Sequence, residues 1–252
     1  MWCAIIHILF PFYRPLLFLC IALITSILGA VLMPASYIFP GGWRTYWIGT
    51  LWARIILRLS CISIAVNGRH HIDPRRSYIV MSNHQSHYDV LALVTTLPLQ
   101  LRWVIKKELR TIPVFGLGCE RLGHIYIDRS NPEKARQSLK TAEDKIRNGA
   151  SITFFPEGTR SPDGNLLPFK KGGFVIALAT QTPILPVTIT GSRRILPKKS
   201  LRVVPGKITV MIHEPVSISR YTNDTKESLI KHVRSCIEAG RKAGGLTAKK
   251  RR

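Results

Sequence analysis

Short apolar runs alternate with amphipathic stretches over most of the chain beyond residue 60. Apolar runs of this length between turn signals are typical of buried strands, and an apolar residue at every third or fourth position is typical of helices. The alternation predicts an α/β fold, with a mixed β-sheet flanked by helices. We expect strands at residues 63–66, 78–82, 103–105, 124–127, 152–155, 184–189 and 208–212.

Two amphipathic helices stand out in this part of the chain. One begins at Pro132, since proline fits the first helical position, and stops at Gly149. The other is expected over residues 225–239. Each has one apolar side, formed by Ala135, Leu139, Ala142 and Ile146 in the first helix and by Leu229, Val233, Cys236 and Ile237 in the second.

The first 60 residues have a different character. Residues 15–33 are almost uninterrupted apolar sequence, and as a helix they would be about 28 Å long, close to the hydrocarbon thickness of a bilayer. Residues 43–59 mix tryptophan and tyrosine with arginine, as segments at a membrane–water interface do. We expect an N-terminal two-helix membrane-anchoring motif; two core helices of a soluble bundle are the alternative.

These patterns predict three parts of the chain. Residues 1–60 would form the membrane-anchoring helices, residues 61–242 the α/β domain, and residues 243–252 a basic C-terminal tail. The five cysteines are scattered and show neither a disulfide framework nor a Cys-x-x-Cys metal site.

The net charge is +23, from 37 basic and 14 acidic residues. A charge this large predicts an anionic partner, which can be nucleic acid, an anionic lipid surface or a phosphorylated substrate. A solvated basic surface without a partner is the alternative. The cluster of Trp43, Tyr46, Trp47 and Trp52 lies in an expected membrane segment rather than among the basic strand ends. We therefore expect anionic membrane lipids and phosphorylated substrates as partners, and no nucleic acid.

His84 and Asp89 stand in a polar segment directly after the strand expected at 78–82. Five residues apart, they would not share a helical face, but they can meet across a tight loop that enters a helix near Asp89. An aspartate bonded to one imidazole nitrogen makes the other a better base, able to take a proton from a hydroxyl group. A polar turn is the alternative. A metal site with His87 is disfavoured, because no further His or Cys spacing completes it.

A second polar segment, residues 155–161, follows the strand expected at 152–155. It contains Arg160, and an arginine at a strand end is well shaped to bind phosphate in a bidentate manner. Lys106 and Arg129 follow other expected strands and can join Arg160 around one phosphate. The alternatives are solvated ion pairs, including a simple Asp128–Arg129 pair.

Four blocks of the sequence, taken in order, resemble those of the glycerolipid acyltransferase family. The first is Asn83-His84-Gln85-Ser86 through Asp89, and the second combines residues 106–116 with 123–129. The third is Phe-Pro-Glu-Gly-Thr-Arg-Ser at 155–161, and the fourth is Ile-Leu-Pro-Val at 184–187. One block is a weak signal, whereas four in order are a strong one.

The resemblance implies roles for particular residues. His84 would be the general base and Asp89 its orienting partner. The implied phosphate-binding residues are Arg129, Glu157, Gly158, Thr159 and Arg160, with Lys106 as a weaker candidate.

The resemblance also implies a reaction. An acyl chain would pass from acyl-CoA or acyl carrier protein to the sn-2 hydroxyl of 1-acyl-sn-glycerol-3-phosphate, without a cofactor or metal, giving phosphatidate. The alternatives are another acceptor (lyso-ornithine lipid, lysophospholipid or glycerol-3-phosphate) and a non-catalytic lipid-binding protein. The expected location is a membrane, at the cytoplasmic face of a bacterial inner membrane.

Overall fold

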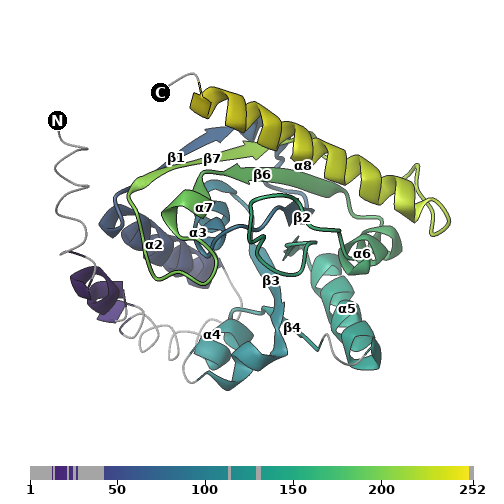
Figure 1. Ribbon diagram of the computed structural model, residues 1–252. Helices are drawn as coiled ribbons and strands as arrows, with labels where there is room; N and C mark the ends of the chain where they lie inside the picture. Colours follow the sequence, from purple (N-terminus) through teal and green to yellow (C-terminus); the bar gives the residue numbers. More distant parts are fainter. Residues whose placement is uncertain are drawn as a thin grey trace.

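The computed structural model describes residues 13, 15–21, 23–24, 27, 43–112, 115–128 and 132–249. At its centre is a seven-stranded sheet in the order β1-β7-β6-β2-β5-β3-β4 (Figure 1). The strands are β1 (Ile62–Asn67), β2 (Ile79–Ser82), β3 (Leu101–Lys106), β4 (Ile125–Ile127), β5 (Ser151–Phe154), β6 (Ile184–Thr190) and β7 (Gly206–Ile212). All seven expected strands are present, within two residues of their predicted bounds.

Helices surround this sheet. They are α2 (Trp43–Leu59), α3 (Tyr88–Thr96), α4 (Phe115–Arg121), α5 (Pro132–Arg147), α6 (Gly172–Thr180), α7 (Ser192–Ile195) and α8 (Lys226–Lys249), with 3-10 turns η1 (Arg69–His71) and η2 (Lys107–Thr111). The predicted mixed sheet flanked by helices is confirmed.

The direction of the strands decides where functional side chains can gather. Five neighbouring strands run parallel to one another: β6, β2, β5, β3 and β4. Strand β7 is antiparallel to β6, and β1 is parallel to β7. The carboxyl ends of β2, β5, β3 and β4 therefore lie along one edge of the sheet. This edge is where open α/β sheets usually bind ligands.

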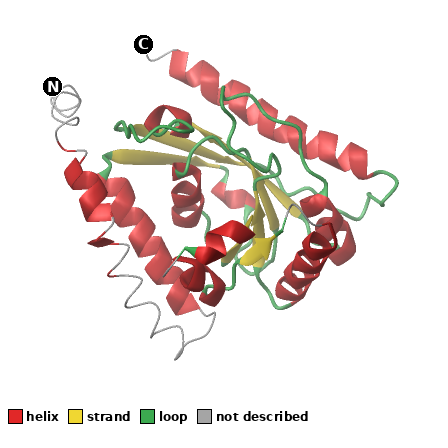
Figure 2. Cartoon of the chain, turned by 60° about the horizontal axis from the view of Figure 1, so that its bottom comes forward, coloured by secondary structure: helices red, strands yellow, loops and turns green. Residues whose placement is uncertain are grey.

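The sheet separates two hydrophobic cores. α2 and α3 cover one face, and α5, α6 and α8 cover the other (Figure 2). Successive side chains of β2 point to opposite faces, so Val80 enters the first core while Ile79 and Met81 enter the second. A strand buried on both faces needs apolar residues throughout, which explains the short apolar runs of the sequence.

Helix α2 shares the first core with the α/β domain. Ala53, Ile56 and Leu57 are buried in it together with Leu93 of α3 and Val80 of β2. Their spacing puts the three α2 side chains on one helical face. One face of α2 thus packs against the α/β domain expected from residue 61, and the boundary at residue 60 stays a prediction. An apolar helical face in a sequence does not reveal whether protein or lipid covers it.

No helix in the described part of the chain is both long enough and apolar enough to cross a bilayer. Residues 22, 25–26 and 28–33 of the expected first membrane helix lie outside the described residues. Membrane anchoring through the first 60 residues stays a prediction.

Helix α8 runs to Lys249, ten residues beyond its predicted end at 239. Glycines cost about 1 kcal/mol each in a helix, so Gly240 and Gly244 favoured an earlier stop. Here they let α8 lie directly on β6: a Cβ at Gly240 would come within 2.5 Å of Thr188, and one at Gly244 within 2.9 Å of Thr190. The tail predicted from residue 243 therefore begins inside this helix, and residues 250–252 lie outside the described part.

We expect Gly240→Ala to destabilise the protein by about 1–3 kcal/mol, because the added methyl group overpacks the contact between α8 and β6. Alanine is otherwise the better helix former, so the sign of the effect tests the packing. The matched control is Gly118→Ala in α4, where a Cβ would meet nothing within 4 Å. Denaturant unfolding of both variants measures the difference. Equal stabilities would contradict the close approach of α8 to β6.

Candidate active site

The loop that carries the first polar segment is fixed at its start by Asn83. This fully buried side chain donates from Nδ2 to the carbonyl oxygen of Ile189 and accepts at Oδ1 from the Ile189 N–H, both at 2.8 Å. The amide thus extends the pairing of β2 with β6 by one step beyond Ser82. The residue that follows, His84, leaves the sheet from a rigid position at the carboxyl edge.

His84 and Asp89 meet across this loop, as their spacing predicts. The Nδ1 atom of His84 lies 3.0 Å from Oδ2 of Asp89, which is in the first turn of α3 and has no exposed surface. The same Oδ2 accepts the backbone N–H groups of Gln85 at 2.6 Å and Ser86 at 2.8 Å. The aspartate therefore shapes the loop and orients the imidazole at once.

The imidazole is held in one orientation with one nitrogen available. Because a carboxylate only accepts hydrogen bonds, Nδ1 of His84 carries the proton and Nε2 is the basic nitrogen. The ring stacks on Phe155, with centroids 3.8 Å apart and planes 10° apart, and 16% of the side chain is exposed. Among the described residues, no hydrogen bond to Nε2 is present, so this atom is available to a substrate.

The second polar segment clamps the backbone of His84. Glu157 accepts the His84 N–H at Oε1, at 2.7 Å, and the Leu167 N–H at Oε2, at 2.9 Å. The N–H of Ser161 donates to the carbonyl oxygen of His84 at 2.8 Å. Both peptide groups of His84 are thus held by the segment that follows β5.

This position does not fit the phosphate-binding role expected of Glu157. Its side chain is 3% exposed and both carboxylate oxygens accept backbone N–H groups. Burial raises the pKa of Glu157, and the two N–H donors oppose that rise. A carboxylate would also repel a phosphate. The Glu157 side chain acts within the protein, by fixing the loop of His84.

Gly158, Thr159 and Arg160 of this segment are less buried than Glu157. Gly158 has φ +73°, a conformation that favours glycine. Lys198 donates from Nζ to Thr159 Oγ1 at 3.2 Å and to the Arg160 carbonyl oxygen at 2.7 Å. Arg160 directly precedes Ser161, whose N–H donates to the His84 carbonyl oxygen, so the Arg160 backbone lies beside the first loop. Partial burial, and after it the charge of Arg160, lowers the pKa of His87 in that loop. Among the described residues, the Arg160 guanidinium has no ion-pair partner, so it is available to an anion.

The two remaining cation candidates follow β3 and β4. Lys106 ends β3 at the same edge of the sheet and its side chain is exposed. Its neighbour Lys107 makes a 2.6 Å ion pair with Asp128 instead. Arg129 lies outside the described residues, so its expected role stays a prediction.

Several supporting residues were not predicted from the sequence. Besides Asn83 and Lys198, two arginines of α8 hold the loop that contains Leu167. Arg234 donates to the Leu166 carbonyl oxygen at 2.9 Å and the Leu167 carbonyl oxygen at 2.6 Å, and Arg241 donates to that of Gly164. These contacts join residues about 70 positions apart, and no local sequence pattern indicates them.

A buried carboxylate, an oriented imidazole and an available arginine at one sheet edge suit acyl transfer to a hydroxyl group beside an anion. The acyltransferase family model matches residues 63–190, and the chain belongs to this family. It is 36% identical to a 1-acyl-sn-glycerol-3-phosphate acyltransferase of Limnanthes alba, over 86% of this chain and 78% of that protein.

Two further relatives support the assignment to the family. The chain is 35% identical to a mouse 1-acyl-sn-glycerol-3-phosphate acyltransferase alpha, over 69% of this chain and 61% of the mouse protein. The crystal structure of the 1-acyl-sn-glycerophosphate (LPA) acyltransferase from Thermotoga maritima matches with a TM-score of 0.75 at 28% identity, over 91% of this chain and 96% of that one. The likeness therefore extends beyond the matched segment to nearly the whole chain.

We expect Glu157→Gln to lower both the stability and the activity, because the amide NH₂ group cannot accept a backbone N–H. One of the two N–H groups, of His84 or of Leu167, would lose its partner, at a cost of roughly 1–3 kcal/mol. The matched control is Glu227→Gln, which removes an exposed ion pair with Lys171 and should change stability by less than about 0.5 kcal/mol. Thermal unfolding and turnover of both variants test this, and wild-type behaviour of Glu157→Gln would contradict the clamp.

Proposed function

We propose that the protein transfers an acyl chain from a thioester, acyl-CoA or acyl carrier protein, to the sn-2 hydroxyl of 1-acyl-sn-glycerol-3-phosphate. The product is phosphatidate. The observation that carries the proposal is the His84 imidazole, which Asp89 orients and Glu157 holds at the backbone, with Nε2 open toward the surface. Relatives named as 1-acyl-sn-glycerol-3-phosphate acyltransferases support this acceptor.

The proposed step is a direct transfer. Nε2 of His84 takes the proton of the acceptor hydroxyl as its oxygen attacks the thioester carbonyl carbon. The new C–O bond forms and the C–S bond breaks, and the proton passes from His84 to the departing thiolate. Asp89 stabilises the positive charge on the imidazole between these events. No electrons are gained or lost, so the step needs no redox cofactor. We propose that the acyl thioester is the sole co-substrate and that no metal takes part.

The acceptor phosphate needs cations near His84. Arg160 lies beside the first loop, and its planar guanidinium suits a phosphate better than a lysine would. Lys106 projects from the same edge of the sheet, and Arg129 is expected there from its position after β4. We propose that these three cations surround the phosphate and so bring the sn-2 hydroxyl to Nε2 of His84.

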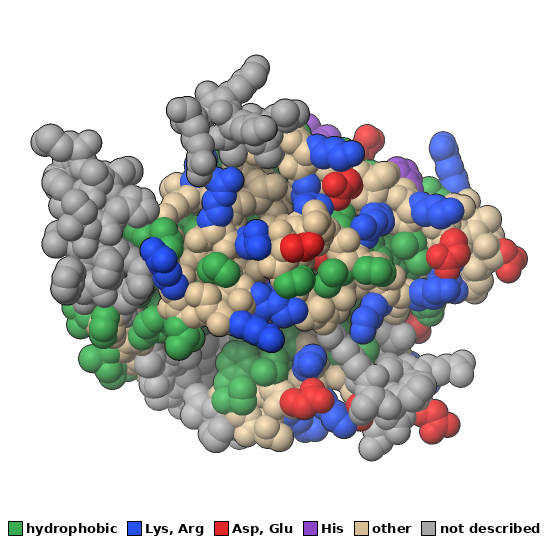
Figure 3. Space-filling model, viewed as in Figure 1, with side chains coloured by type: hydrophobic (Ala, Val, Ile, Leu, Met, Phe, Trp, Pro, Cys, Tyr) green, Lys and Arg blue, Asp and Glu red, His purple; other side chains and the backbone are tan. Residues whose placement is uncertain are grey.

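The product belongs in a bilayer, and we propose that the protein acts at the cytoplasmic face of a bacterial inner membrane. Its first residues support this location, since large apolar side chains are 53–61% exposed there: Leu16, Leu19, Leu23 and Ile27. In the space-filling view, exposed apolar side chains gather at the lower left of the molecule while Lys and Arg spread over the same face (Figure 3).

We expect His84→Ala to reduce turnover by roughly 10²–10⁴-fold, because the base is lost, while lysophosphatidate still binds. A matched control is His70→Ala, which removes another imidazole, exposed in η1, and should leave turnover unchanged. Initial rates in detergent micelles, together with a lipid-binding assay, measure both effects. Turnover that survives in His84→Ala would contradict the mechanism.

The acceptor itself is tested with a panel. The purified protein should acylate 1-acyl-sn-glycerol-3-phosphate faster than lyso-ornithine lipid, a neutral-headgroup lysophospholipid or glycerol-3-phosphate. The physical reason is that only the first combines a phosphomonoester for Arg160 with an acyl chain. Each acceptor is offered with acyl-CoA and with acyl carrier protein, and product is quantified by mass spectrometry. Preference for another acceptor would overturn the substrate assignment, and binding without turnover would indicate a lipid-binding protein.

A further inference from the structure

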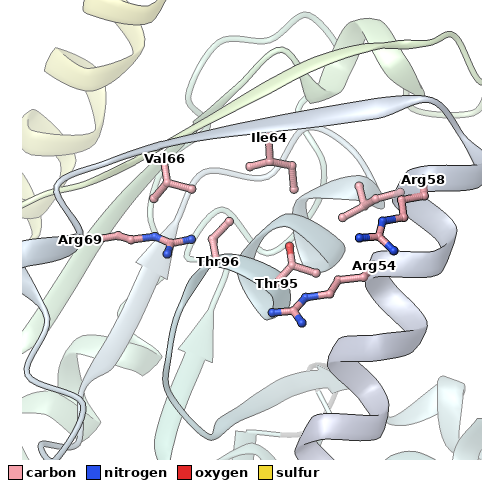
Figure 4. A pocket seen from close by; sticks show the side chains of 8 residues that line it. Arg54, Arg58, Ile64, Val66, Arg69, Thr95 and Thr96 are labelled. Atoms are coloured by element: carbon pink, nitrogen blue, oxygen red, sulfur yellow. The ribbon is translucent and has the colours of Figure 1, made fainter.

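A second cationic cavity lies away from His84, between α2, β1 and α3. Its volume is about 210 Å³ and its walls are Arg54, Leu57, Arg58, Ile64, Val66, Arg69, Thr95 and Thr96 (Figure 4). Thr95 and Thr96 are in the last turn of α3, about 10 Å along the helix axis from Asp89 in its first turn. The cavity is therefore separate from the candidate active site.

Three arginines converge on this cavity. Arg54 and Arg58 extend into it from α2 on one side, and Arg69 reaches in from the opposite side (Figure 4). None of the eight lining residues is acidic, and none of the ion pairs found among the described residues involves these arginines. Three like charges that face one another repel unless an anion lies between them. Guanidinium groups bind phosphate oxygens in a bidentate manner.

The remainder of the wall suits a lipid better than a free ion. Leu57, Ile64 and Val66 give the cavity an apolar side beside its cationic one. Its volume is below the roughly 300–1,000 Å³ of pockets that enclose a drug-sized ligand. The space fits a phosphate headgroup with the start of its glycerol, whereas a whole acyl-CoA is too large.

The outer face of α2 points to the same ligand. One exposed stripe along the helix starts at Trp47 and continues through residues four, seven and eleven positions later, which are Leu51, Arg54 and Arg58. The stripe is apolar at Trp47 and Leu51, which are 56% and 53% exposed, and cationic from Arg54 onward. Arg54 lies about 10 Å along the axis from Trp47.

This distance is comparable to the depth of the headgroup layer, roughly 5–8 Å per leaflet. A helix inclined to the membrane, with Trp47 at the hydrocarbon boundary, therefore places Arg54 near the lipid phosphates, and Arg58, about 16 Å from Trp47 along the axis, at the outer limit of the headgroup layer.

We propose that Arg54, Arg58 and Arg69 form a binding site for the headgroup phosphate of an anionic membrane lipid. The site is distinct from the acceptor site at Arg160 and docks the α2 face of the protein on the membrane. This headgroup site does not depend on the proposed reaction, because none of its three arginines takes part in the candidate active site.

The test is vesicle sedimentation of the full chain with phosphatidylcholine vesicles, with and without phosphatidylglycerol. The pocket variant is R54Q/R58Q/R69Q, and the matched control R147Q/R220Q/K231Q removes three exposed charges from the region of α5 and α8. A cation near an anionic surface contributes about fivefold in binding, so the pocket variant should lose on the order of 100-fold on the anionic vesicles. The control should lose no more than about tenfold, and activity on a monomeric, water-soluble acceptor should be unchanged in both.

Two further measurements separate a built site from diffuse charge and from a free ion. R54K/R58K/R69K keeps the charge but loses the planar fork, so it should bind anionic vesicles more weakly than wild type. Equal losses in the pocket and control variants would overturn the proposal. So would saturable binding of inorganic phosphate without vesicles that the pocket variant lacks, since the ligand would then be a free phosphate. Circular dichroism establishes that each variant is folded.

Discussion

The hydrogen bond from the His84 N–H to the buried carboxylate of Glu157 is the contact on which the candidate active site depends. Glu157 lies in the loop after β5, so this bond, together with the one from the Ser161 N–H to the His84 carbonyl oxygen, joins the loops that follow β2 and β5. The second carboxylate oxygen of Glu157 accepts the Leu167 N–H. Arg234 and Arg241 of α8 donate to carbonyl oxygens of the loop that contains Leu167. The backbone position of His84 is thus set by residues of the loop after β5 and of α8. A buried carboxylate is costly unless it is hydrogen-bonded, and here both of its oxygens are.

The direction of the strands brings further functional residues to the same edge of the sheet as this contact. Because β2, β5, β3 and β4 are parallel neighbours, the residues that follow them gather at one edge, although His84 and Arg160 are 76 positions apart in the sequence. His84 and Arg160 lie there, and Lys106 ends at the same edge. α3 begins at this edge with Asp89 and ends at the cavity of Arg54, Arg58 and Arg69. Two groups of cations that suit phosphate therefore lie near opposite ends of α3.

The amino-acid pattern predicted much of the fold because the signals for strands and for helix ends are local in the sequence. Every strand coincides with a short apolar run, and β2, β5 and β6 are buried on both faces. Helix α5 follows from Pro132 and Gly149. The pattern failed where a distant surface decided the outcome. Gly240 by itself favours the end of a helix. In the structure α8 continues, because the glycine leaves room for the helix to pack directly against Thr188 of β6. Residues 43–59 have the composition of an interfacial helix, yet one face of α2 is packed in the domain core.

The candidate site divides in the same way. The sequence by itself determined the chemically active groups: His84 with Asp89 five positions away, and Arg160 after a strand, because residue type and short spacing fix which groups can transfer a proton or bind a phosphate. Only the tertiary structure decided what each group faces. It directed the Glu157 carboxylate toward the His84 backbone, made Asn83 a bridge to Ile189, and brought Arg69 opposite Arg54. These contacts join residues that are distant in the chain, and only the packing of the sheet and helices sets their distances.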